Sequence, residues 1–252
     1  MIEATNINKS FNDNHVLKDV TVFFEKGKIN QIIGQSGMGK TVLLKSLVGL
    51  HEVDTGQINF DGRNFTAMSF MERKEIRKEI GMVFQGGALF DSLTIQENIK
   101  FPMDMFTNWS EEEKLDRVNF CLSKVNIPDT NKLFPSELSG GMQKRAAIAR
   151  AISLNPRYLF CDEPNSGLDP ITALIIDNLI REITIEFNIT TVINTHDMNS
   201  VMEIGDKIIF IYQGYKWWEG NKNDIFTSDN KELNDFVFAS ELFKKVRDNH
   251  HK

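Results

Sequence analysis

Short apolar runs alternate with amphipathic segments along most of the chain, which predicts an α/β fold with a mainly parallel sheet. The first 33 residues contain several short runs of alternating apolar and polar positions, which predict a β-rich start. Further strands are predicted at residues 57–62, 81–84, 158–164, 190–194 and 207–212. Helices are predicted at residues 40–48, 110–125, 141–153 and 170–187.

Residues 86–155 have a helical character that differs from the rest of the chain. Ser110 precedes three glutamates in a capping-box pattern that opens a helix, and Pro156 marks the end of the next one. This stretch is therefore expected to be a helical insert in the α/β core. The last residues, 221–252, form a polar helical tail with one apolar stripe, which packs on its own domain or contacts a second subunit. The stripe consists of Phe236, Phe238, Leu242 and Phe243.

Composition excludes several classes of protein. Hydrophobic residues make up 41% and charged residues 25% of the 252 residues, which is ordinary for a folded globular protein. A net charge of −6 argues against a dedicated nucleic-acid binder, which usually carries a basic excess. Cys121 and Cys161 match no metal-binding spacing and are expected to be reduced thiols. No signal peptide and no apolar run of the ~20 residues needed to span a bilayer is expected, so a partner would supply any membrane helices.

The segment from Gly34 to Thr41 fits the phosphate-binding pattern G-x-x-x-x-G-K-[ST], between a predicted strand and a predicted helix. Glycines let successive backbone N–H groups point at phosphate oxygens, and the helix N-terminus adds partial positive charge. Lys40 then contacts the β- and γ-phosphates, and the Thr41 hydroxyl binds Mg²⁺. This pattern alone does not separate a kinase, a GTPase and a motor. The predicted ATP contacts here are Gly34, Gln35, Ser36, Gly37, Met38, Gly39, Lys40, Thr41 and Val42.

Two adjacent acids end the apolar strand predicted at 158–164. Buried carboxylates are costly, and ligands of parallel sheets bind at the carboxyl ends of strands. Asp162 is therefore predicted to hold Mg²⁺, and Glu163 to act as the general base that activates the attacking water. The alternative is an ordinary solvated junction between a strand and a loop.

Leu138-Ser139-Gly140-Gly141 stands directly before a predicted helix, and with it the chain resembles the ATP-binding subunits of ABC transporters. The resemblance extends over residues 1–220, a single nucleotide-binding domain. It implies a P-loop ATPase with a RecA-like core sheet, an N-terminal antiparallel β part and a helical subdomain at about 86–155. It also implies a homodimer with ATP at the interface. There Ser139, Gly140, Gly141, Gln143 and Asp169 contact the nucleotide held by the other subunit.

The remaining family residues follow in order. Phe11 matches the aromatic residue that stacks on adenine, with a strand core position as the alternative. Gln85 matches the glutamine that senses Mg²⁺, water and the membrane subunit, and His196 matches the histidine that contacts the γ-phosphate. The family resemblance thus makes Lys40, Gln85, Glu163 and His196 the catalytic group, and Thr41, Gln85 and Asp162 the Mg²⁺ ligands. Two positions depart from the family, since Met142 replaces the commoner glutamine and Asn165 the usual threonine.

Residues 83–99 and 139–145 look like the corresponding segments of Mla/Mce-type ATPases. That likeness implies phospholipid transport between the inner and outer bacterial membranes. The implied partners are an MlaE-like permease dimer and an MCE-domain lipid-binding protein, and the implied location is the cytoplasmic face of the inner membrane. Three alternatives remain: an importer ATPase for amino acids or ions, an ATPase acting on ribosomes or DNA, and a nucleotide-binding scaffold without turnover.

Overall fold

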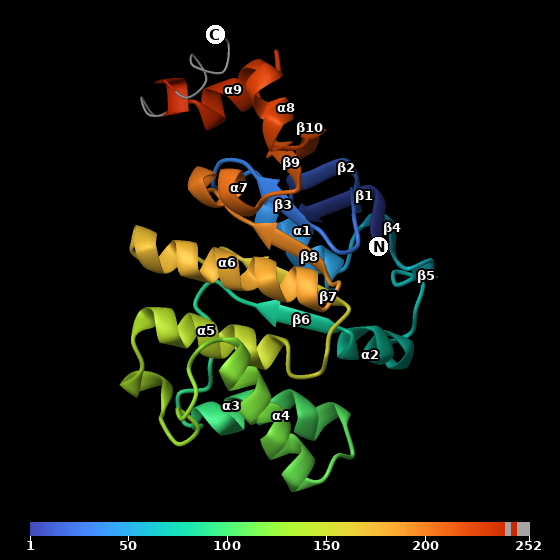
Figure 1. Cartoon of the computed structure of the whole chain (residues 1–252). Coiled ribbons are helices and arrows are strands. Elements are labelled where there is room, and N and C mark those ends of the chain that lie inside the picture. The colour runs from blue at the N-terminus through green and yellow to red at the C-terminus, as the bar shows by residue number, and fades with distance from the viewer. Residues whose placement is uncertain (240–242, 246–252) are drawn as a thin grey trace. The chain divides into compact units, whose positions relative to one another are not determined.

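The computed structural model describes residues 1–239 and 243–245. Its elements form two compact units (Figure 1), the first made of Met1–Met68 and Val192–Lys252 and the second of Ser69–Thr191. The chain returns from the second unit to the first within strand β8 (Thr190–Asn194). Both units combine strands with helices, which confirms the predicted α/β class. No helix in the described part of the chain is long and apolar enough to cross a membrane.

The first unit begins with an antiparallel sheet, as predicted. Its strand order is β2-β1-β4-β5, and the bounds are β1 (Ile2–Phe11), β2 (Asn14–Phe24), β4 (Thr55–Phe60) and β5 (Arg63–Asn64). Strand β1 buries Ile2, Ala4 and Ile7, so one face of the sheet is apolar. A two-residue turn joins β1 to β2, and Asn12 there has a φ of 51°, a conformation that asparagine tolerates.

A second sheet of the first unit has the order β10-β9-β3-β8. Strands β3 (Ile29–Ile33) and β9 (Lys207–Tyr212) are parallel, and β10 (Tyr215–Gly220) is antiparallel to β9. Every residue of β3 and β8 is buried, as expected for strands covered on both faces. Helix α1 (Lys40–Leu47) follows β3 after six residues, and α7 (Met198–Ile204) follows β8.

The C-terminal helices α8 (Lys222–Thr227) and α9 (Lys231–Val237) pack on the core of the first unit. They add Ile225, Leu233, Val237 and Phe238 to a cluster that contains residues of β3 and β9. Phe236 stacks on Phe210 of β9 with ring centroids 5.6 Å apart. The apolar stripe therefore packs on its own unit, as the simpler of the two interpretations predicts. Leu242 lies outside the described residues.

The second unit contains two parallel strands and most of the longer helices. Strand β6 (Ile80–Val83) pairs with β7 (Tyr158–Asp162). The helical elements are α2 (Phe70–Lys78), α3 (Ile95–Phe106), α4 (Glu111–Lys124), the 3-10 turn η1 (Pro135–Glu137), α5 (Gly140–Ala151) and α6 (Pro170–Glu186). The capping box predicted at Ser110 and Glu113 is present, and equivalent boxes open α2 and α3. Neither α2 nor α3 is among the predicted helices, because α2 is short and α3 contains Pro102.

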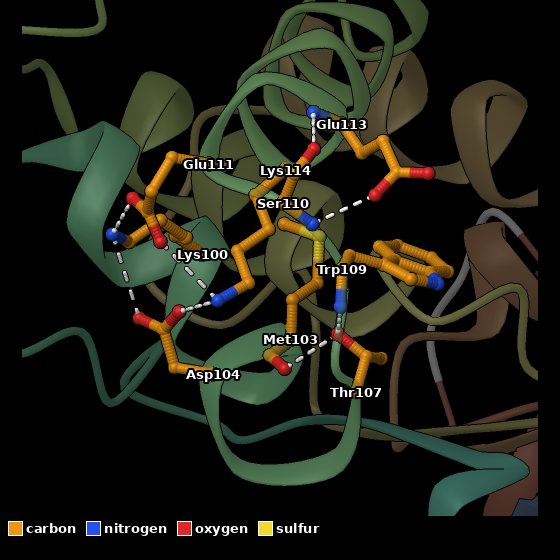
Figure 2. A network of polar contacts seen from close by, with 9 residues as sticks. All are labelled: Lys100, Met103, Asp104, Thr107, Trp109, Ser110, Glu111, Glu113 and Lys114. Carbon is orange, nitrogen blue, oxygen red and sulfur yellow. Dashed lines mark hydrogen bonds and ion pairs between the residues drawn. The ribbon is translucent and has the colours of Figure 1, made fainter.

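A network of alternating charges joins α3 to α4 (Figure 2). Lys114 Nζ lies 2.7 Å from Asp104 and 3.3 Å from Glu111, and Lys100 Nζ lies 2.7 Å from Glu111 and 3.7 Å from Asp104. The Thr107 hydroxyl between the helices donates to the Met103 carbonyl at 2.8 Å, which closes the end of α3. Pairs of this exposure contribute little singly, and together they fix the angle at which α4 leaves α3.

A buried asparagine holds the loop before α3. Asn98 is 0% exposed, and its amide nitrogen donates to the carbonyls of Phe90, Leu93 and Thr94 at 3.1, 3.1 and 3.0 Å. Its oxygen accepts from the Phe90 N–H at 2.8 Å. Asn98 thereby replaces backbone pairing for a loop that has no strand partner of its own.

We expect Asn98→Ala to lower the free energy of unfolding by roughly 2–3 kcal/mol, because it leaves buried backbone groups without their partner. Urea denaturation followed by circular dichroism measures the loss. Asn119→Ala is the control, because Asn119 on α4 is exposed and makes a single 2.9 Å bond to Asn131. Equal stability of the two variants would refute the role given to Asn98.

Candidate functional site

The loop between β3 and α1 is shaped by three glycines with left-handed backbone angles. The φ values are 144° at Gly34, 82° at Gly37 and 101° at Gly39. A Cβ atom at Gly34 would lie 2.4 Å from the Ile211 carbonyl oxygen, so no other residue fits there. Gly37 instead faces open space. The loop therefore passes tightly over the end of β9 and then curls outward, which is the shape of an anion-binding concavity.

The N-terminus of α1 differs from those of the long helices of the second unit. Its N-cap is Gly39, so no side chain caps its first turn. Helices α2 to α6 are each capped by a serine, threonine or aspartate, namely Ser69, Thr94, Ser110, Ser139 and Asp169. The first-turn amides and the dipole of α1 are thus available to an external anion. Lys40 is 6% exposed and its ammonium donates to the Gln35 carbonyl at 3.1 Å, which keeps a positive charge over the loop.

The end of β8 reaches the same helix terminus. Asn194 Nδ2 donates to Thr41 Oγ1 at 3.0 Å. His196 follows two residues later and is exposed, between the buried Thr195 and the N-cap Asp197 of α7. Oxygen ligands such as the Thr41 hydroxyl suit Mg²⁺, and an exposed imidazole suits a contact with a phosphate.

Phe11, at the end of β1, is 40% exposed rather than part of the core. Its ring meets His51 edge-on, with centroids 5.2 Å apart and planes at 78°. Lys9 Nζ lies 5.3 Å from the same ring, and the Lys9 ammonium pairs with Asp54 at 2.9 Å. Burial, followed by the charges of Lys45 and Lys9, lowers the pKa of His51, so the imidazole is neutral at pH 7. An exposed, laterally supported ring is suited to stacking on a base.

In the second unit, the two predicted acids end β7 in different environments. Asp162 is 5% exposed, whereas Glu163 is half-buried. Glu163 has a φ of 50°, a left-handed conformation that costs energy for a residue with a side chain. Strain of this kind gathers at functional positions, which fits the prediction of a catalytic carboxylate at Glu163.

Gln85 follows β6 and is tied to two other predicted motifs. Its amide nitrogen donates to Ser166 Oγ at 3.4 Å, in the segment that includes Asp169. The Lys144 ammonium on α5 donates to the Gln85 carbonyl. Burial lowers the pKa of Lys144, while Cys161 and Glu163 nearby raise it. Further along α5, Arg150 donates to the carbonyls of Gly87 and Ala88 at 2.8 and 2.7 Å.

The motif Leu138–Gly141 opens α5. Ser139 Oγ accepts from the Met142 N–H at 3.3 Å and so caps the helix. A Cβ atom at Gly141 would lie 2.6 Å from Thr172 of α6, which makes glycine necessary at this close helix contact. The predicted nucleotide contact Gln143 donates instead to the carbonyls of Pro135 and Leu138, at 2.9 and 3.2 Å, and holds the preceding turn.

Asp169 caps α6 in the described chain. Its carboxylate accepts from the N–H groups of Ile171 and Thr172, both at 3.0 Å, and from the Thr172 hydroxyl at 2.5 Å. These bonds, chiefly the one from the Thr172 hydroxyl, lower the pKa of Asp169. Asn165, which replaces the family threonine, donates to the buried Asp177 at 2.8 Å. The segment between β7 and α6 is therefore anchored at both ends.

The structure thus divides the predicted residues into two groups. The first unit holds Phe11, the loop 34–42 and His196, and the second holds Gln85, Asp162, Glu163, the 139–143 segment and Asp169. Two residues that contact these groups, Asn194 and Lys144, are not among the predicted site residues. Both residues could have been noticed in the sequence. An amide at the end of a buried strand needs a hydrogen-bond partner, and so does a lysine on the buried face of a helix. In the described part of the chain, no three His, Cys, Asp or Glu side chains gather as a metal cluster.

Comparison with known proteins gives consistent matches. A family model described as ABC transporter matches residues 17–166. The mkl protein of Mycobacterium tuberculosis H37Rv, named a probable ribonucleotide transport ATP-binding protein, is 37% identical over 94% of this chain. The methionine import ATP-binding protein MetN of Clostridium acetobutylicum is 37% identical over 96% of this chain and 75% of its own length.

Solved structures agree with the sequence matches. The dimeric structure of MJ0796, a bacterial ABC transporter cassette, has a TM-score of 0.81 and 31% identity, over 88% of this chain and 98% of that one. A dimeric post-hydrolysis state of the same cassette, bound to ADP and phosphate, has a TM-score of 0.80 and 30% identity over the same shares of the two chains. This chain spans 66% of the length of the mkl protein. By sequence and by fold, the chain belongs to the ABC transporter family, as an ATP-binding cassette.

Proposed function

We propose that this chain binds and hydrolyses ATP with Mg²⁺ as one half of a homodimer. The observation that carries the proposal is the uncapped N-terminus of α1 behind the glycine loop, with the Lys40 ammonium beside it. Such a terminus binds a phosphate better than any neutral ligand, because amide donors, helix dipole and lysine all favour negative charge. The MJ0796 dimer bound to ADP and phosphate supports the same ligand for this chain.

Each predicted residue has a task in this reaction. The loop amides and Lys40 bind the phosphates, and Phe11 stacks on the base. Thr41, Asp162 and the Gln85 amide oxygen are the hard oxygen ligands that suit Mg²⁺, which when bound offsets negative charge on the phosphates. Glu163 accepts a proton from the attacking water, and His196 donates a hydrogen bond to the γ-phosphate.

The 139–143 segment and Asp169 serve the nucleotide of the second subunit in this proposal. A single subunit already has one phosphate loop, and Ser139 caps only the Met142 N–H of α5, so we assign the glycine-led start of this helix to a second phosphate. The dimeric structures of MJ0796 support such an arrangement. ATP then bridges two subunits, and hydrolysis weakens the bridge. A closing and opening dimer can do mechanical work on a partner.

A cavity of about 420 Å³ in the second unit offers a place for that partner. Phe84, Ala88, Phe90 and Phe101 are among its lining residues, and Arg77 and Arg150 supply positive charge. Phe90 and Phe101 are 43% and 37% exposed, and their rings lie 4.9 Å apart. An amphipathic helix with an acidic residue fits such an apolar, cationic groove. We assign this groove to a helix of an integral-membrane permease, and we propose that the chain works at the cytoplasmic face of the bacterial inner membrane.

We also propose that residues 1–220 form one nucleotide-binding domain, with the helical subdomain at about 86–155 and a C-terminal tail at 221–252. The transported compound is proposed to be phospholipid, moved with an MlaE-like permease and an MCE-domain protein. This finer proposal rests on the likeness of residues 83–99 and 139–145 to Mla/Mce-type ATPases. The second candidate is an amino-acid importer, which the 37% identity to MetN favours.

Co-purification in mild detergent tests the partner and the groove together. We expect the tagged chain to recover a permease, an MCE-domain protein and phospholipid, as identified by mass spectrometry. Phe101→Asp should lose the permease and keep ATP binding, because it places a charge in the apolar groove. Phe120→Asp is the matched control, since Phe120 on α4 has the same 37% exposure and does not line the cavity. A permease accompanied by a small-solute receptor would favour the importer, and full recovery by Phe101→Asp would refute the groove assignment.

Glu163→Gln tests the general base. We expect phosphate release to fall at least ~100-fold while ATP-bound dimers accumulate, because the base is lost and the phosphate contacts remain. A phosphate-release assay and size-exclusion chromatography with ATP measure the two effects. Glu186→Gln, which changes an exposed acid paired with Lys124, should hydrolyse ATP at the wild-type rate. Undiminished turnover in Glu163→Gln would show that another group is the base.

Ser139→Arg tests the contact in trans. Arginine at this exposed helix start should block ATP-driven dimerisation and hydrolysis while each subunit still binds one ATP. Light scattering with ATP measures dimer formation, and equilibrium dialysis measures binding. Ser136→Arg in η1, three residues earlier and also exposed, should dimerise normally. Normal ATP-driven dimers of Ser139→Arg would exclude the proposed trans contact.

A further inference from the structure

A buried asparagine stands at the end of a strand that otherwise suits an apolar interior. Strand β8 is buried along its whole length, and Asn194, its last residue, is 0% exposed. The two preceding residues, Val192 and Ile193, are apolar and equally buried. An amide in this place costs free energy unless it makes hydrogen bonds that matter to the fold or to function.

The amide is directed at one functional group. Asn194 Nδ2 donates to Thr41 Oγ1 at 3.0 Å, across 153 residues of sequence. The strand end that carries Asn194 is itself fixed, because the next residue, Thr195, donates its N–H to the Ile32 carbonyl of β3 at 3.1 Å. Ile32 lies two residues before the first glycine of the phosphate loop. The sheet therefore holds the amide in register with the loop and with the first turn of α1.

The direction of this hydrogen bond matters for the chemistry of the hydroxyl. A threonine oxygen has two acceptor lone pairs and one proton, and the groups around the hydroxyl decide where the proton points. The Asn194 N–H occupies one lone pair and so orients the other, and a cation ligand must present a lone pair rather than its proton. A leucine or valine at position 194 would fill the space and remove this donor from the hydroxyl.

We propose that Asn194 is a positioning residue that orients the Thr41 hydroxyl for binding a divalent cation. The inference rests on the proposed function, in which Thr41 is a ligand of nucleotide-bound Mg²⁺. Asn194 touches neither the nucleotide nor the cation in this role and acts through Thr41. Its effect is therefore confined to the cation-dependent part of nucleotide binding.

The test measures nucleotide binding without turnover. A fluorescent, non-hydrolysable ATP analogue is titrated into the full-length chain in EDTA and at increasing Mg²⁺. The variant is Asn194→Leu, whose side chain has nearly the shape of asparagine. We expect the Mg²⁺ concentration that gives half of the gain in analogue affinity to rise roughly fivefold, which corresponds to the loss of about one hydrogen bond. The affinity measured in EDTA should stay unchanged, because the phosphate contacts of the loop remain.

Two further variants serve as references. Thr41→Ala removes the proposed ligand and should raise the same Mg²⁺ midpoint more than Asn194→Leu does. Thr191→Val removes a buried hydroxyl from the same strand, where it lies 2.6 Å from the Thr184 hydroxyl, and should leave the midpoint unchanged. If Asn194→Leu fails to fold, Asn194→Val, with a side chain that suits a strand, replaces it.

The outcomes distinguish the positioning role of Asn194 from the proposed function. A raised midpoint in the Asn194 and Thr41 variants with wild-type affinity in EDTA supports the positioning role. A normal midpoint in Asn194→Leu beside a raised one in Thr41→Ala overturns that role and leaves the proposed function standing. An equal loss in EDTA and in Mg²⁺ also overturns it, because it shows a general structural defect. A normal midpoint in Thr41→Ala contradicts the Mg²⁺ assignment of the proposed function itself.

Discussion

The uncapped N-terminus of α1 is the constraint on which the rest of the first unit depends. A helix that begins with glycine leaves its first amides to solvent or to a ligand, which an isolated helix of eight residues would not tolerate well. The fully buried β3 and its parallel partner β9 supply the stability that the helix lacks. Gly34 lets the loop pass the Ile211 carbonyl of β9, so the sheet sets the position of the phosphate loop directly. A stable sheet thus maintains an open helix end whose amides suit a phosphate.

Helix α5 holds the loop after Gln85 in the second unit. Two cations on this helix bind carbonyls of a single loop, Lys144 at Gln85 and Arg150 at Gly87 and Ala88. Both are largely withdrawn from water, and burial lowers their pKa values, so the carbonyl contacts offset a real desolvation cost. The same helix begins at Ser139. The loop after Gln85 is therefore linked directly to α5 by polar contacts near both ends of the helix.

Short sequence patterns predicted the strands and helices whose formation depends on residues close together in the chain. The observed bounds of β8 and β9 match the predicted 190–194 and 207–212, because short apolar runs between turn residues have few alternatives. Helix α3 was missed because Pro102 interrupts its pattern, although Thr94 and Glu97 form a capping pair like the one that opens α4. The motifs placed Thr41 and Gln85 as candidates, but their partners Asn194 and Lys144 lie far away in sequence. Such partners follow from strand register and helix contact, which a single sequence does not specify.

The activity of this chain is easier to infer from its sequence than the transported compound is. The residues that bind phosphate differ from the residues that line the proposed docking groove. Phosphate binding requires glycine, lysine, hydroxyl and carboxylate at fixed spacings, so the sequence shows it plainly. In the proposed function, cargo does not touch any of these residues, and it acts on the chain only through the permease helix assigned to the groove beside Phe90 and Phe101. That groove demands an apolar surface with negative charge near Arg77 and Arg150. Permeases for different compounds can meet this demand equally well, so the likeness to MetN and the likeness to lipid-transport ATPases are compatible with one docking mode. In the proposed function, selection among cargoes is therefore a property of the permease.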